Sequence, residues 1–285
     1  MAAWRKLGII AAGGDLPLAL AEQCQASGQP YFVARVTPFA DVALAAHPND
    51  AHDLGAMGAR IEALKQAGCD AITFVGQASR QDLTKLNWDA VGISMLPALA
   101  AGAREGDDAL LRALLNEHAK HGFQIVGADE VTAEMVAPAG VLGGHAPSAA
   151  DMNDIQHAAR VVAALGALDI GQAAVVCAGL TLGVEAQEGT DALLRRIADL
   201  PAIVRGSPDS RRGVLLKRPK PIQERRVDLP VIGVRTMEGA AKAGLSGVAV
   251  EAGAALLVRR DAIIAAADAA GVFVYGFTRA DIGEA

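Results

Sequence analysis

Short apolar segments alternate with amphipathic ones through the first 126 residues, and this alternation limits the fold more than any other feature. The segments 7–11, 31–36 and 71–76 are apolar and have the length of buried strands. Segments with helical periodicity follow them, for example 108–121, where leucines recur three or four residues apart. Strands that alternate with helices predict a parallel sheet with right-handed crossovers. We therefore expect a Rossmann-like parallel sheet in the N-terminal half.

The second half has a less regular α/β pattern. The segment 138–150 is rich in Pro, Gly, Ala and Ser, which is typical of a linker. A helix is expected to begin near Ser148 or Asp151, since both residues are good N-caps. We therefore expect two domains, residues 1–137 and a mixed α/β domain at 151–285. The elements expected in the second domain are strands at 173–177, 182–186, 214–216, 247–250 and 272–275, and a helix at 190–197 that Thr190 caps.

Composition excludes several classes of protein. The chain has 285 residues, enough for two ordinary domains, and 52% hydrophobic but only 4% aromatic residues, which suits helices packed on parallel strands. Its three cysteines are isolated, so the sequence indicates neither a disulfide framework nor a zinc site. The N-terminus does not resemble a signal peptide, and no apolar run approaches the ~18 to 20 residues that span a bilayer. These features predict a cytoplasmic protein that is at most membrane-associated.

A basic, proline-containing run is the most distinctive segment of the second half. Between Arg205 and Arg226 there are eight Lys or Arg residues and two acids, although the formal net charge of the chain is -6. Prolines at 219, 221 and 230 keep most of the segment 217–233 out of a regular helix. The cluster indicates a local anionic partner rather than a nucleic acid. A solvated basic loop is the alternative interpretation.

Carboxylates lie in and near the basic run. Gln223, Glu224 and Asp228 are interleaved with its cations, a mixture that phosphoryl chemistry needs: cations bind phosphate charge, and carboxylates bind Mg²⁺ or position a water. The segment 185–191 is also rich in acids. Helix capping explains its Thr190 and Asp191 but leaves Glu185, Gln187 and Glu188 without a structural role.

Two strand-to-helix turns of the first half are candidate ligand sites. Gly13, Gly14, Asp15 and Leu16 follow the first strand, where backbone N–H groups and a helix N-terminus can bind phosphate. Ligands of open α/β sheets bind at the carboxyl ends of the strands. A tight turn and a solvated arginine are the structural alternatives. The candidates after the strand 71–76 are Gln77, Ser79 and Arg80.

Several motifs are absent. The chain has no G-x-G-x-x-G fingerprint, no Walker lysine and no nucleophile elbow. The six histidines have no metal-binding spacing, and His118 and His121 are expected on an exposed helix face. Asp107 is interpreted first as an N-cap, with metal binding by Asp107 and Asp108 as the alternative.

Six motifs together resemble the LpxI family, the UDP-2,3-diacylglucosamine pyrophosphatases of lipid A biosynthesis. They occur in the family's order between about Lys6 and Phe277, and their agreement in register is specific although each one alone is weak. The motifs are A-G-G-x-L-P at 12–17, F-V-G-x-x-S-R at 74–80, G-D-D-A-L-L-R at 106–112, G-Q-A-A-V-V at 171–176, V-E-A-Q-E-G-T-D-A at 184–192 and K-P-I-Q-E-x-R-V-D-L-P at 220–230.

The resemblance implies Mg²⁺-dependent hydrolysis at the α-phosphorus, which releases UMP and lipid X. It also implies an N-terminal nucleotide-binding domain and a C-terminal catalytic domain. The enzyme is expected in the cytoplasm of Gram-negative bacteria, with transient contact to the inner membrane leaflet and a homodimer as the candidate assembly. The implied catalytic residues are Asp228, Glu224 and Lys220, and the metal ligands are Asp228, Glu188 and Glu224. The implied substrate-binding residues are Gly13, Gly14, Asp15, Leu16, Gln77, Ser79, Arg80, Gln187, Thr190, Lys217, Gln223, Arg225 and Arg226.

Two other classes of function remain open. A nicotinamide-dependent oxidoreductase would use the first strand–helix–strand unit, but it needs the missing glycine fingerprint and an acid after the second strand, where Arg35 stands. A non-catalytic nucleotide- or lipid-binding protein would need the turns and the basic run but no activated water.

Overall fold

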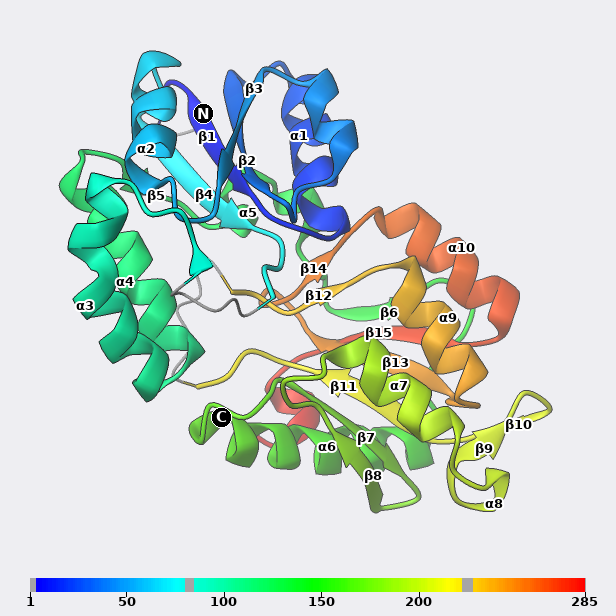
Figure 1. Ribbon diagram of the computed structural model, residues 1–285. Coiled ribbons are helices and arrows are strands. Elements are labelled where there is room, and N and C mark those ends of the chain that lie inside the picture. The colour runs from blue at the N-terminus through cyan, green and yellow to red at the C-terminus, as the bar shows by residue number, and fades with distance from the viewer. Residues whose placement is uncertain (1–3, 80–84, 222–227, 285) are drawn as a thin grey trace. The chain divides into compact units, whose positions relative to one another are not determined.

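The computed structural model of the protein describes residues 4–79, 85–221 and 228–284, and the chain forms two compact units (Figure 1). The first unit comprises residues 4–133, with Asp228 assigned to it. The second comprises residues 134–221 and 229–284.

The first unit is a five-stranded sheet with helices on both sides. Its strands are β1 (Leu7–Ala11), β2 (Tyr31–Thr37), β3 (Asn49–Asp53), β4 (Ala71–Val75) and β5 (Gln124–Ile125). Its helices are α1 (Asp15–Ser27), α2 (Met57–Gln66), α3 (Ala90–Glu105), α4 (Asp107–Lys120) and α5 (Ala128–Val131). Every neighbouring pair of strands is parallel, which confirms the predicted parallel sheet.

The strand order β3-β2-β1-β4-β5 places β1 at the centre. Leu7 is in register with both Tyr31 of β2 and Ala71 of β4. The chain first moves outward from β1 to β2 and β3, and then resumes on the other side with β4 and β5. The carboxyl ends of β1 and β4 therefore mark the point where the strand order reverses, which is where ligands bind in open α/β sheets.

Two elements of the first unit differ from the sequence expectations. β3 has the polar sequence Asn-Asp-Ala-His-Asp. This sequence is tolerated because β3 lies at the edge of the sheet. α3 contains Gly92 and Pro97, which discourage a helix prediction, but Asp89 caps it by accepting a 2.8 Å hydrogen bond from the Gly92 amide. Met95 and Leu99 of α3 are buried and pack with α4, so tertiary packing overrides local propensity here.

The second unit is built on a six-stranded mixed sheet with the order β6-β15-β13-β11-β7-β8. Its strands are β6 (Gly140–Leu142), β7 (Ala173–Cys177), β8 (Leu180–Val184), β11 (Val214–Lys217), β13 (Gly247–Glu251) and β15 (Phe273–Phe277). Its helices are α6 (Ala149–Ala167), α7 (Thr190–Ala198), α8 (Ala202–Arg205), α9 (Val234–Lys242) and α10 (Arg260–Ala270). Two small ribbons complete the unit: β9 (Gly206–Ser207) with β10 (Ser210–Arg211), and β12 (Val231–Ile232) with β14 (Leu256–Leu257).

Alternate residues of this sheet face two separate apolar cores. Val175, Leu215 and Val248 pack with α7, α9 and α10 on one side, whereas Val176 and Leu216 pack with α6 on the other (Figure 1). The three central strands β11, β13 and β15 are parallel, and the flanking β7 and β6 are antiparallel to them. This arrangement confirms the predicted mixed α/β character of the C-terminal half.

The segment 138–150, which we expected to be an irregular linker, includes β6. Residues 140–142 pair with β15, so this part of the segment belongs to the sheet of the second unit. Two glycines of this strand pair need their small size: Gly140 of β6 has a φ of 96°, and a Cβ at Gly276 of β15 would collide with the Pro138 carbonyl oxygen. The units divide between Ala133 and Glu134. The expected start of α6 is confirmed, because Ser148 caps it through Asp151.

No helix in the described part of the chain is long and apolar enough to cross a membrane. The three cysteines are buried free thiols, and burial raises the pKa of Cys24 and of Cys69 to about 11.

Candidate active site

The two candidate turns of the first unit are joined by backbone hydrogen bonds. Gly13 follows β1 and Gln77 follows β4, and each amide donates to the other's carbonyl oxygen at 2.9 and 2.8 Å. The structure thus brings both turns together at the point where the strand order reverses. Gln77 and Ser79 are exposed there, while Arg80 lies outside the described residues.

Glycine is required where these turns meet. Gly76 has a φ of 94°, and a Cβ at this position would lie 2.5 Å from the Gly13 carbonyl oxygen. Gly14 is the N-cap of α1 with a φ of 94°, and the space around it is open. Asp15 is exposed in the first turn of α1, whereas Leu16 is buried and therefore contributes packing. The turn offers backbone N–H groups at a helix N-terminus, which suits a phosphate.

The second unit contains a buried chain of hydrogen bonds at the end of β11. Lys217, the last residue of that strand, is 5% exposed, and its Nζ donates to Thr190 Oγ1 at 2.8 Å and to the Val231 carbonyl oxygen at 3.1 Å. The Thr190 hydroxyl donates in turn to Glu185 Oε1 at 2.5 Å. The predicted substrate residues Thr190 and Lys217 are thus in direct contact, but Thr190 is not an N-cap as expected. Gly189 takes that position, because Thr190 has helical geometry and its hydroxyl is engaged elsewhere.

Glu188 and Gln187 lie on the exposed turn before α7. Glu188 Oε2 accepts from the Ala186 amide at 3.1 Å, and Oε1 pairs with Arg196 Nη2 at 3.1 Å. Glu188, for which the sequence suggested no structural role, therefore closes the turn and contacts α7.

Several cations of the basic run have structural partners rather than an open binding surface. Arg205 and Arg211 donate to carbonyl oxygens at the C-terminal end of α9, and Arg212 donates to carbonyl oxygens of α8. Lys220 Nζ pairs with Asp169, which follows α6. The charge count overestimated the cations available to an anionic ligand, since hydrogen bonds to distant backbone carbonyls leave no signal in the sequence.

The described residues do not by themselves form a magnesium site. In this part of the chain no three His, Cys, Asp or Glu side chains gather in a way that could hold a metal ion. Asp228 lies within the described residues and is half-buried. Glu188 already contacts an arginine and a backbone amide. Glu224 falls outside the described residues, as do the substrate candidates Gln223, Arg225 and Arg226. Metal binding by these residues remains a prediction.

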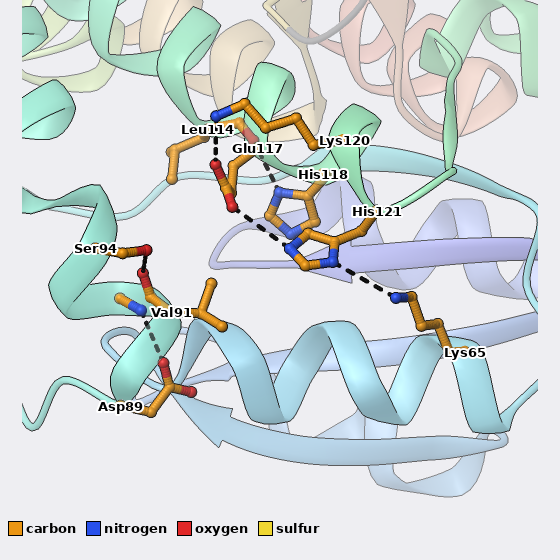
Figure 2. Close-up of polar contacts among 10 residues, drawn as sticks. Lys65, Asp89, Val91, Ser94, Leu114, Glu117, His118, Lys120 and His121 are labelled. Carbon is orange, nitrogen blue, oxygen red and sulfur yellow. Dashed lines mark hydrogen bonds and ion pairs between the residues drawn. The ribbon is translucent and has the colours of Figure 1, made fainter.

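Sequence reasoning missed the buried state of His118. Its side chain is fully buried, and Nδ1 donates to the Leu114 carbonyl oxygen at 2.8 Å. The ring stands edge-on to that of Phe74, with 5.0 Å between the two ring centroids. The prediction that His118 lies on an exposed helix face was wrong, because α4 packs against β4 through the side that carries His118. Figure 2 shows His121 beside it, between Lys65 and Glu117.

Sequence reasoning singled out Glu185 but assigned it no role, and it did not identify the partners of Arg218. An acid directly after a strand in the motif at 184–192 was the available signal for Glu185, which is 7% exposed. Arg218 had no local signal, since its partners Glu251 and Glu284 are distant in sequence.

Both halves of the chain match one protein family. The LpxI N-terminal domain matches residues 6–135, and the LpxI C-terminal domain matches residues 138–275. The UDP-2,3-diacylglucosamine pyrophosphatase LpxI of Caulobacter vibrioides (strain ATCC 19089 / CIP 103742 / CB 15) is 53% identical over 272 residues, which cover 95% of this chain and 97% of that protein. These findings confirm the resemblance noted from the six motifs, and the chain belongs to the LpxI family.

Proposed function

We propose that the protein hydrolyses the pyrophosphate bond of UDP-2,3-diacylglucosamine, giving UMP and 2,3-diacylglucosamine 1-phosphate (lipid X) in lipid A biosynthesis. The observation that carries the proposal is the 53% identity, along nearly the whole chain, to a protein named as a pyrophosphatase of this substrate. Identity of this extent includes residues of both units, so it supports a shared reaction and not only a shared fold.

In the proposed reaction, a water oxygen attacks the α-phosphorus, and the bond from that phosphorus to the bridging oxygen breaks. The bridging oxygen leaves with the β-phosphate, so UMP gains the water oxygen. Asp228 accepts the proton that the attacking water loses, a role that suits a half-buried carboxylate. Glu224 and Lys220 complete the proposed catalytic set.

The proposed substrate contacts come from groups that complement phosphate. The amide of Gly14 supplies an N–H donor at the start of α1, with Gly13, Gln77 and Ser79 beside it. Lys217 supplies an ammonium, which binds charge that builds on the phosphoryl oxygens, and the Thr190 hydroxyl accepts a hydrogen bond from that ammonium.

We propose separately that the activity requires a divalent cation. Asp228, Glu188 and Glu224 offer the oxygen ligands that Mg²⁺ prefers, and the ion would neutralise phosphate charge when bound. The test is UMP release before and after chelation with EDTA, followed by addition of Mg²⁺. Full activity in excess EDTA would refute the requirement.

Hydrolysis in H₂¹⁸O tests the reaction and the site of attack together. We expect the label in UMP and none in lipid X. Label in lipid X would show attack at the β-phosphorus, and the absence of UMP would refute the proposed function. Oxidation of NADH or NADPH without UMP release would support the oxidoreductase alternative instead.

We also propose that the protein works in the cytoplasm and contacts the inner leaflet transiently, because a diacylated substrate resides in a membrane. Co-sedimentation with vesicles that contain the substrate, compared with vesicles that lack it, tests this contact. Light scattering after size-exclusion chromatography tests for the homodimer.

A further inference from the structure

The hydrogen-bonded chain from Glu185 through Thr190 and Lys217 to Val231 leads us to a role that the family assignment does not provide. We propose that Glu185 and Thr190 are positioning residues. They act through Lys217 to hold the segment that follows Asp228, at the point where the chain enters the second unit. This inference rests on the proposed function for its catalytic consequence.

The first argument is electrostatic. Lys217 is 5% exposed, and the two groups among the described residues that accept from its ammonium, a hydroxyl and a backbone carbonyl, are both neutral. A buried ammonium without a counter-charge costs much free energy. Glu185, which is 7% exposed, supplies that charge through the shared Thr190 hydroxyl.

The second argument is the direction of the hydrogen bonds. A threonine hydroxyl has one hydrogen, and Thr190 gives it to Glu185 Oε1. The oxygen lone pairs of Thr190 therefore remain available to accept from Lys217. The Glu185 carboxylate thus sets the orientation of the hydroxyl that accepts from the ammonium. Glu185 Oε2 is buried and has no hydrogen-bond partner among the described residues. An unsatisfied buried oxygen is unfavourable for stability alone, which favours a functional reason for this carboxylate.

The third argument concerns where the chain of hydrogen bonds ends. Val231 begins β12, three residues after Asp228, and its carbonyl oxygen accepts from Lys217. The β12–β14 pairing and the 2.8 Å bond from the Leu256 amide to the Pro230 carbonyl oxygen also hold this region. Loss of the lysine contact should therefore shift the segment without unfolding it.

The test uses Thr190→Val, which removes the hydroxyl at nearly constant volume, and Thr190→Ser, which keeps it. The matched control is Thr236→Val in α9, a buried threonine near a helix N-terminus whose hydroxyl accepts from the Gly233 amide at 3.3 Å. For Thr190→Val we expect kcat to fall at least tenfold with KM changed less than about twofold. Serine should restore most of the activity.

Hydrogen exchange over residues 229–232 separates this inference from the proposed function. Faster exchange in Thr190→Val, but not in Thr236→Val or Thr190→Ser, supports the positioning role even if the wild type releases no UMP. Unchanged exchange overturns it. A raised KM at constant kcat also overturns it, since Thr190 would then bind the substrate directly.

Discussion

Arg218 and Glu284 form a two-point ion pair, with Nη1 2.8 Å from Oε1 and Nη2 2.9 Å from Oε2. Arg218 Nε also donates to Glu251 at 3.0 Å, at the end of β13. The guanidinium is nearly buried and joins the C-terminal segment to the carboxyl ends of β11 and β13. Paired geometry of this kind is stronger than an ordinary surface ion pair.

We expect Glu284→Gln to lower the melting temperature by a few degrees at neutral pH. The Arg218 hydrogen bonds hold the pKa of Glu284 below its ordinary value of 4.5. A carboxylate with a depressed pKa stabilises the fold above its unfolded-state pKa, and this stabilisation is lost as the pH falls through the folded-state value. The difference between wild type and variant should therefore shrink below about pH 4.5. Glu238→Gln, at an exposed position of α9, is the control. Equal melting of both variants at pH 7 would contradict the prediction.

Arg218 also shows what the sequence could and could not predict. The buried strands β1, β4 and β7 were predictable because their apolar runs are local. The partners of Arg218 lie 33 and 66 residues away, so a count of nearby charges could not reveal them. The basic run was therefore interpreted as more available to a ligand than it is.

The candidate site was predictable in part for the same reason. Gly13 and Gln77 each follow a recognisable strand, and the parallel topology brings them together. The contact of Lys217 with Thr190 depends on the order of strands in the second sheet, which periodicity does not specify. β12 and β14 are two residues long, too short for any periodic signal.

Gly76→Ala tests the turn that the two strand ends share. A Cβ at this position meets the Gly13 carbonyl oxygen at 2.5 Å, and Gly76 also has a positive φ. Gly68→Ala is the matched control, because Gly68 has a φ of 77° and a Cβ added there would have no atom within 4 Å. Both variants carry backbone strain of about 1 kcal/mol. We expect only Gly76→Ala to raise KM for the nucleotide substrate several-fold. Equal KM values would show that this turn does not bind substrate.

Asp228→Ala tests the proposed general base. We expect kcat to fall by two or more orders of magnitude, roughly the effect of losing a general base. The variant should remain folded and still bind substrate, because the turns of the first unit and Lys217 are unchanged. Asp209→Asn, at an exposed position in the basic region, is the control for a lost negative charge. Near-normal turnover with a lower melting temperature would make Asp228 a structural residue.

His118 makes the stability of the protein depend on pH. Burial lowers its pKa from 6.5 to about 4, and the positive charges of Arg60 and His121 act in the same direction. The hydrogen bond to the Leu114 carbonyl and the charge of Glu117 oppose this shift but do not cancel it. The folded protein therefore keeps this imidazole neutral at pH values where the unfolded chain protonates it.

Because the unfolded state binds the extra proton, the free energy of unfolding should decrease as the pH falls from 6.5 to about 4. A shift of this size corresponds to at most about 3 kcal/mol over the window. Urea unfolding at pH 7 and pH 5 measures the change. His118→Leu should flatten the slope, whereas His121→Gln, a partly exposed neighbour in α4's C-terminal turn, should retain most of it. An equal slope in wild type and His118→Leu would show that other groups cause the dependence.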